Sequence, residues 1–323
     1  MFVEQLLSRL GRRIEKMINS LKDLSIVQIM LRAKENKIVV PAFNIAYLPM
    51  AEPVAMALIR TRAFGIVEVA RPDYEKFGAK SLEAVAAEYR KYEDRDFMRL
   101  HEDHTPVIDE EGRKVDWKSL IRKALKLNFD SVMIDGSRLS LEENIEVTKE
   151  VVKMAHINGV PVEAELGAVL GHEKGPIPPY EELFKSGKGF TDPDEARRFV
   201  KETGVDWLSV AVGNIHGAIS GAAKDQKKLE ARLNIEHLHK LAELTDIPLV
   251  LHGGSGVNQQ SVLAGIQNGI CKINVGTEIR QAYENALKEK PGDIKFAQDA
   301  VQEKTIFLIT EYYRIVHSAD SLL

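Results

Sequence analysis

Residues 247–275 read IPLVLHGGSGVNQQSVLAGIQNGICKINV, and this stretch shows the unit from which the chain is built. The apolar run at 247–252 reads as a buried strand, and residues 271–275 read as another. Between them, residues 258–268 follow a helical pattern that begins at Asn258, a residue type favoured at helix starts. The stretch therefore predicts two parallel strands joined by a helix.

The same alternation of strand-like and helical segments continues along the chain. Helical patterns include 50–63, 117–127, 141–157, 194–203 and 234–245, and Asp192 with Pro193 predicts the start of the fourth. The candidate strands are 38–44, 65–70, 96–103, 130–135, 160–166, 206–213, 247–252 and 271–275. Eight such units in about 250 residues predict an α/β fold of the (β/α)8 TIM-barrel type, followed by C-terminal helices.

A doubly wound open sheet is the alternative to a barrel. That fold usually carries a glycine-rich phosphate loop after its first strand. Residues 41–50, PAFNIAYLPM, contain no glycine. The barrel is therefore the better interpretation.

Composition narrows the class of protein. The chain has 323 residues, of which 44% are hydrophobic and 28% charged, with a net charge of -4. This balance gives no overall attraction to nucleic acid or to a membrane, so an anionic substrate needs a local site. The single cysteine, Cys271, excludes a disulfide framework and fits a cytoplasmic protein. No apolar run approaches the ~20 residues that span a bilayer.

The N-terminal residues 1–22 predict a separate amphipathic helix before a single barrel domain at 23–323. Apolar side chains recur at spacings of four and three, with basic residues between them: Val3, Leu7, Leu10, Ile14, Met17 and Leu21. Such a helix packs on the barrel or on another subunit, or lies on a membrane surface. The heptad-like spacing favours a homo-oligomer, a dimer or a tetramer.

Three histidines stand just past three of the predicted strands. His104 ends DFMRLHEDH, His216 ends WLSVAVGNIH and His252 ends IPLVLH. In a barrel the carboxyl ends of all strands meet at one face, which carries the active site. Three neutral imidazoles meeting there predict a site for Zn²⁺ or another divalent cation, with positions left open for a substrate.

The motif HEDH at residues 101–104 places an acid beside one of these histidines. Strand alternation puts His101 and Asp103 on one face, and His104 follows where the strand gives way to a loop. Asp103 is therefore a candidate acid or base, and His104 a candidate ligand. A polar strand end with hydrogen-bonded histidines is the alternative.

The fifth strand carries two carboxylates on one face, Glu163 and Glu165. Burying them is costly unless a cation or a salt bridge stabilises them. Further along, Gly167 and Gly171 precede His172 and Glu173. Glu173 is a candidate for a mobile base that removes a proton next to a bound carbonyl group.

Glycine-rich turns follow the sixth and seventh strands, in Asn214-Ile215-His216-Gly217 and in His252-Gly253-Gly254-Ser255-Gly256. Backbone N–H groups in such turns bind anions, and barrels often bind phosphate near strands seven and eight. Asn274 and Thr277 in the eighth unit offer further hydrogen bonds. Simple turn or cap roles remain the alternative.

Two further polar residues end or lie within strands. Asp135 in MIDGS could orient a histidine, hold a second cation or cap the next helix. Lys272 shares its face with Asn274 and is a candidate Schiff-base lysine, although the metal interpretation explains more of the sequence.

Taken in order, these motifs resemble those of the class II, metal-dependent fructose-bisphosphate aldolase family, which includes tagatose-bisphosphate and other ketose-bisphosphate aldolases. The resemblance runs from about residue 25 to about residue 290. The matching segments are PAFN, HEDH, SVMIDGS, VEAELG, FTDP, AVGNIHG, LHGGSG and KINVGTE.

The resemblance implies a carbon–carbon lyase of carbohydrate metabolism that forms or cleaves a ketose phosphate through an enediolate of dihydroxyacetone phosphate. It implies His104, His216 and His252 as metal ligands, with Glu165 as an alternative ligand and Asp135 nearby. Asp103 would handle the proton on the aldehyde-derived oxygen, and Glu173 would be the mobile base. The expected substrate-binding residues are Asn44, Gly217, Gly253, Ser255, Asn274 and Thr277.

Several positions depart from the family pattern. The serine of a family segment, S-x-G-A, is expected after the second strand, where this chain has Ala70 and Arg71. Glu102 replaces an apolar residue, and the loop 105–116 is longer than usual. These differences lie where the aldehyde half of the substrate should bind. An aldolase for another ketose phosphate and a catalytically silent homologue therefore remain alternatives.

Overall fold

The computed structural model describes residues 19–167, 180–214 and 231–323. Of Ser255, within the last range, it describes the backbone but not the side chain. Most of the predicted N-terminal helix falls on residues 1–18, outside this part of the chain. The described end of that segment forms a single turn of 3-10 helix, η1, at Leu21–Asp23.

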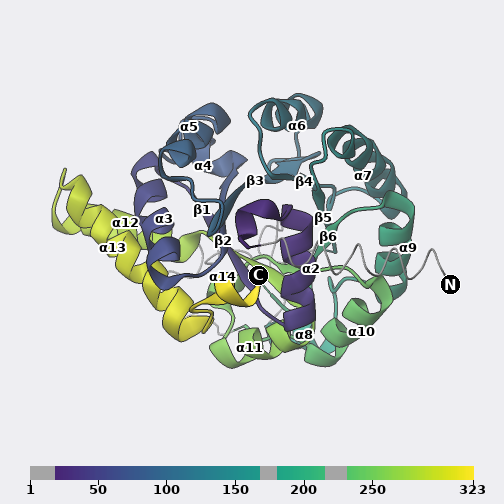
Figure 1. Ribbon diagram of the computed structural model, residues 1–323. Coiled ribbons are helices and arrows are strands. Elements are labelled where there is room, and N and C mark those ends of the chain that lie inside the picture. Colours follow the sequence, from purple (N-terminus) through teal and green to yellow (C-terminus); the bar gives the residue numbers. More distant parts are fainter. Residues whose placement is uncertain (1–18, 168–179, 215–230) are drawn as a thin grey trace, which may run out of the picture.

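Eight parallel strands close into a barrel in the order in which they occur along the chain (Figure 1). The last strand pairs with the first, with Val40 opposite Lys272 and Phe43 opposite Val275. The strands are β1 Val40–Asn44, β2 Gly65–Ala70, β3 Met98–Pro106, β4 Ser131–Asp135, β5 Val162–Leu166, β6 Trp207–Val210, β7 Leu249–Leu251 and β8 Ile270–Val275. The predicted (β/α)8 fold is therefore confirmed.

One strand differs from its prediction in a way that shapes the site. β3 does not end at Asp103 but continues to Pro106, and its register with β4 shifts between Glu102 and Thr105. His104 occupies this irregular position with a φ of +44°. An extra residue in one strand re-aims the side chains around it. Asp103 and His104, although adjacent in sequence, consequently both line the cavity at the barrel mouth.

A ring of helices surrounds the barrel and shields the outer faces of its strands (Figure 1). Asp192 accepts hydrogen bonds from the N–H groups of Asp194 and Glu195, and Asn258 accepts one from Ser261, so both predicted helix starts are confirmed. The longer helices are α2 Ile26–Asn36, α3 Ala51–Thr61, α5 Leu82–Tyr92, α6 Trp117–Lys126, α7 Leu141–His156, α9 Pro193–Thr203, α10 Ile235–Thr245, α11 Gln259–Gln267, α12 Thr277–Glu289 and α13 Ile294–Phe307. A short helix that the sequence did not predict, α4 Arg71–Glu75, follows β2 directly.

The amino-terminal end of the barrel is closed by α2 and by the short C-terminal helix α14, Ser318–Ser321, which lie across the opening in Figure 1. Ile29 and Met30 of α2 pack with apolar side chains of the strands, including Val40 and Trp207, in a second buried cluster. This end of the barrel is therefore filled, and the cavity lies at the opposite end, where the strands finish. Among the described residues, no helix is both long enough and apolar enough to cross a bilayer.

Candidate metal centre and active site

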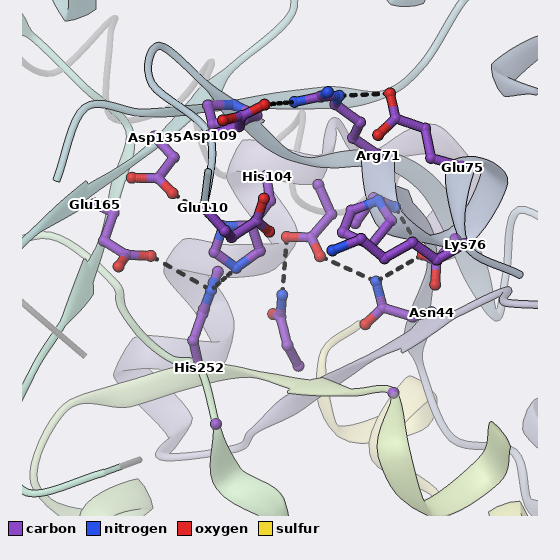
Figure 2. A pocket seen from close by; sticks show the side chains of 18 of the residues that line it. Asn44, Arg71, Glu75, Lys76, His104, Asp109, Glu110, Asp135, Glu165 and His252 are labelled. Carbon is purple, nitrogen blue, oxygen red and sulfur yellow. Dashed lines mark hydrogen bonds and ion pairs between the residues drawn. The ribbon is translucent and has the colours of Figure 1, made fainter. Parts of the chain in front are cut away.

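A cavity of about 550 Å³ opens at the carboxyl ends of the strands (Figure 2). Its lining includes nine residues that the sequence assigned to the site. They are Asn44, Asp103, His104, Asp135, Glu165, His252, Gly253, Asn274 and Thr277. Their side chains and backbones come from β1, β3, β4, β5, β8, the loop after β7 and the start of α12. The barrel therefore brings the predicted constellation to one place.

Two of the three predicted histidine ligands face each other. The Nε2 atom of His104 lies 2.6 Å from Nδ1 of His252. The second nitrogen of each ring faces a carboxylate, at 3.4 Å between His104 and Asp135 and at 2.8 Å between His252 and Glu163. When one ring nitrogen of a neutral histidine donates its N–H to a carboxylate, the other ring nitrogen carries the lone pair. The two facing nitrogens are thus oriented to share a cation or a proton.

Carboxylates complete a donor set around these rings. Ligand atoms of His104, Asp135 and Glu165 lie within 4.8 Å of one another, and those of Asp103, His104 and His252 form a second such group. Glu165 Oε2 is buried and has no hydrogen-bond partner among the described residues. It lies 3.6 Å from His252 Nδ1, the contact drawn as a dashed line in Figure 2. Nitrogen and carboxylate donors in this arrangement fit a divalent cation such as Zn²⁺.

The electrostatics of the cluster also favour a positive charge. Burial alone would favour the neutral ring of His104, but Asp103, Asp135 and Glu165 together raise the pKa of this histidine well above its usual range. Burial and the neighbouring Asp135 raise the pKa of Glu165. A bound cation would satisfy both groups without a proton.

Four predicted contributions to the site lie outside the described residues. They are the ligand His216, the mobile base Glu173, the backbone of Gly217 and the side chain of Ser255. Their roles stay predictions.

Asp103 is a buried carboxylate held from both sides. Asn44 Nδ2 donates to its Oδ2 at 3.0 Å, and Asn274 Nδ2 donates to its Oδ1 at 2.9 Å. Although burial opposes ionisation, the charges of His104 and Lys272 lower the pKa of Asp103 to about 2. Asp103 is therefore an anion at neutral pH, in a fixed orientation beside the candidate ligands. The two asparagines predicted to bind substrate also position this carboxylate.

The barrel interior beneath the cavity separates the two glutamates of β5. Glu163 is fully buried and accepts hydrogen bonds from Trp207 Nε1 at 2.9 Å and from His252, while Lys272 Nζ lies 2.9 Å from its Oε2. It is the salt-bridged core group, whereas Glu165 lines the cavity. Burial favours a neutral amine, but Glu163 and Glu68 raise the pKa of Lys272. A persistently charged lysine is a poor nucleophile, which argues against an imine mechanism.

Sequence reasoning missed Asp73 and Glu68 as members of this region. Asp73 is 7% exposed, lines the cavity and accepts a hydrogen bond from Asn44. Burial, reinforced by Asp103, raises its pKa to about 7. The Arg71-Pro72-Asp73 segment carries the signals of a short capped helix, which would have placed the carboxylate at the end of β2. Arg71 also lines the cavity and forms ion pairs with Glu75 and Asp109.

Comparisons with known proteins identify the family of this chain. A family model described as fructose-bisphosphate aldolase class-II matches residues 24–321. Fructose-bisphosphate aldolases from two Streptococcus pneumoniae strains, serotype 4 (TIGR4) and R6, are each 37% identical over 186 residues. These alignments cover 57% of this chain and 58% of each relative.

Solved structures extend the similarity over most of the chain. The YdjI aldolase from Escherichia coli K12 superposes with a TM-score of 0.69 at 28% identity, covering 89% of this chain and 96% of that one. A putative fructose-1,6-bisphosphate aldolase from Coccidioides immitis gives 0.70 at 25% identity over 90% and 96%. Fructose-bisphosphate aldolase from Campylobacter jejuni, at 18% identity and 0.68 over 92% and 95%, supports the fold alone.

Proposed function

Because the chain belongs to the class-II fructose-bisphosphate aldolase family, we propose that it cleaves and forms a phosphorylated ketose with a divalent cation as its cofactor. The proposed three-carbon donor is dihydroxyacetone phosphate. One observation carries the proposal: His104 and His252 meet at the barrel mouth, and each ring is oriented by its own carboxylate. A Zn²⁺ ion is the proposed cofactor, with His216 as its third histidine ligand.

Bound at this place, a divalent cation would polarise the carbonyl group of the substrate and so ease loss of a proton from the adjacent carbon. The residues of the chain have separate tasks in that reaction. We assign removal of the carbon-bound proton to Glu173. To Asp103, which is ionised and held by Asn44 and Asn274, we assign the transfer of the proton of the aldehyde-derived oxygen.

The phosphate of the donor is assigned to the side of the cavity formed after β7 and β8. Gly253 and Gly254 line it with backbone rather than side chains, and Gly253 has a φ of +66° that favours glycine. Thr277 lines it at the first position of α12, a thirteen-residue helix whose N-terminal N–H groups attract an anion. Gly217 and Ser255 are proposed to add further hydrogen bonds.

Metal removal tests the proposal directly. The protein is treated with a chelator, then supplied with Zn²⁺, and cleavage of ketose phosphates is followed by detection of dihydroxyacetone phosphate. We expect activity to be lost with the metal and restored with it. His252→Ala should lose metal and activity together, whereas His239→Ala, an exposed histidine of α10, should keep both.

Two outcomes would contradict the proposal. One is full turnover by protein shown to be free of metal. The other is borohydride trapping of the substrate on Lys272, which would indicate an imine mechanism.

A further inference from the structure

The cavity has one wall that the proposed chemistry does not explain. It consists of the residues within 70–77 and 106–113 that line the cavity, from α4 and the loop after β3, and we call it the acidic wall. It carries five carboxylates against three basic side chains: Asp73, Glu75, Asp109, Glu110 and Glu111, against Arg71, Lys76 and Arg113. The side after β7 and β8 contributes no carboxylate among the described lining residues, and its Arg280 lies over the Phe77 ring of the acidic wall, 4.6 Å from the ring centroid, and pairs with Glu284. The two ends of the cavity therefore differ in charge.

The arginines of the acidic wall are occupied by contacts within the protein. Arg71 Nε lies 2.6 Å from Glu75 Oε1, and its Nη1 lies 3.3 Å from Asp109 Oδ2, so the guanidinium is held between two carboxylates (Figure 2). Arg113 in turn pairs with Asp109 at 2.9 Å. A phosphate bound to either arginine would have to displace these partners and would meet the remaining carboxylates at close range.

Asp73 offers this wall an unused acceptor. Both of its hydrogen bonds, from Ala70 N–H at 2.8 Å and from Asn44 Nδ2 at 3.3 Å, go to Oδ2. Among the described residues Oδ1 has no hydrogen-bond partner, although the residue is more than nine-tenths buried and lines the cavity. An oxygen in that position accepts a hydrogen bond from a hydroxyl group, and in the ionised form of Asp73 it also repels an anion.

The position of Asp73 relative to Asp103 identifies which part of a substrate it would meet. The single amide of Asn44 donates to both carboxylates. If Asp103 serves the oxygen of the reacting aldehyde, Asp73 lies within reach of a hydroxyl group one or two carbons further along. Glycines and the start of α12 take the donor phosphate on the other side.

Resting on the proposed aldolase function, we propose that the acidic wall selects an unphosphorylated polyhydroxy aldehyde, with Asp73 as the acceptor for its hydroxyl group. The corresponding ketose would carry one phosphate, on the dihydroxyacetone half, and a neutral tail.

Three aldehydes of equal carbon number test this inference on the metal-loaded full chain. They are glyceraldehyde, glyceraldehyde 3-phosphate and propanal, each condensed with dihydroxyacetone phosphate while kcat/KM is measured. We expect glyceraldehyde to exceed glyceraldehyde 3-phosphate by at least about 10-fold. Asp73→Ala should lower kcat/KM for glyceraldehyde at least about 10-fold. It should lower kcat/KM for propanal less than about threefold, since propanal has no hydroxyl group that could bind Asp73.

A conservative variant and a matched control separate binding from folding. In Asp73→Asn the single amide oxygen keeps the cap on Ala70 and the NH2 group faces the cavity, where it donates to the hydroxyl oxygen instead of accepting from it. Its kcat/KM for glyceraldehyde should therefore stay within about threefold of the original, while that for glyceraldehyde 3-phosphate should rise because the negative charge is gone. Asp293→Ala removes a comparable helix cap, at the start of α13 and outside the cavity lining. Its preference among the three aldehydes should match that of the unaltered protein.

The inference is overturned if the unaltered protein prefers glyceraldehyde 3-phosphate to glyceraldehyde, or if Asp73→Ala lowers kcat/KM equally for all three aldehydes. Deuterium exchange into dihydroxyacetone phosphate, measured without any aldehyde, distinguishes these failures from failure of the aldolase proposal. Exchange together with a preference for the phosphorylated aldehyde removes only the inference. No exchange and no condensation with any aldehyde removes both.

Discussion

Asp103 shows how a single residue acquires a role from its surroundings. Its two oxygens are fixed by Asn44 and Asn274, and the cationic groups around it keep it ionised despite burial. We expect Asp103→Ala to retain bound metal, because the histidines and Glu165 remain, but to lower kcat by at least about 100-fold, the usual effect of losing an acid–base group. Metal analysis and steady-state kinetics of the same preparation check this. Turnover at the original rate would remove the role assigned to Asp103.

The neighbouring Glu102 predicts a pH dependence of stability. Burial raises the pKa of Glu102 to about 8, whereas a glutamate in an unfolded chain titrates near about 4.3. Between these values the folded protein binds more protons than the unfolded chain, so the free energy of unfolding falls as the pH rises. The Glu102→Gln variant cannot ionise at this position. Its advantage over the original protein in free energy of unfolding should therefore grow by about 1–3 kcal/mol from pH 6 to pH 8.5.

Urea unfolding of metal-free protein at the two pH values measures that difference. Metal-free samples are needed because Glu102 lies next to the candidate ligands. A gain that is the same at pH 6 and at pH 8.5 would contradict the assigned cause, since it would not follow ionisation.

At the scale of the elements, Arg99 of β3 joins the barrel to the segment that closes its amino-terminal end. The guanidinium is fully buried and donates to the backbone carbonyls of Leu21 and Leu24, at 2.8 and 3.1 Å, as well as to those of Arg95 and Met98. Arg99→Met would leave these carbonyls buried without a donor, so we expect a loss of about 3–5 kcal/mol of stability.

The matched control is Arg95→Met, in which a more exposed arginine loses its ion pairs with Glu93 and Asp130. Because exposed pairs contribute little, its stability should fall by no more than about 1 kcal/mol. Chemical unfolding compares the two, and metal content of the folded protein should be unchanged in both, since the site lies at the other end. Equal losses would show that burial of Arg99 is not the cause.

The elements also show what the sequence could predict. Period and cap signals identify local structure, so the eight strands and the caps at Asp192 and Asn258 were found. The irregularity at His104 was not, because it depends on the register between β3 and β4, which no local pattern records. The five-residue helix α4 is likewise too short for a hydrophobic period.

For the whole molecule, the barrel explains why part of the site was predictable. A TIM barrel gathers the strand ends at one face, so polar residues at strand ends, such as His104, Asp135 and His252, can be grouped from the sequence alone. Asp73 escaped this reasoning because it lies three residues past its strand and turns inward only through α4. Glu163 and Glu165 could not be told apart, because their difference depends on Lys272 reaching across the barrel interior.

The assembly of the whole molecule is the remaining prediction. Residues 1–18 carry most of the heptad-like apolar spacing, and a helix of this kind needs an apolar surface to cover it. Deleting residues 1–18 leaves Leu21 and Leu24, whose carbonyls hold Arg99, so the barrel end should stay closed and the domain folded. We expect the truncated protein to have a lower mass by light scattering than the full chain. If assembly adds no stability to the barrel, the unfolding midpoint should be the same for both proteins at equal protomer concentration. An identical mass would show that the N-terminal segment takes no part in assembly.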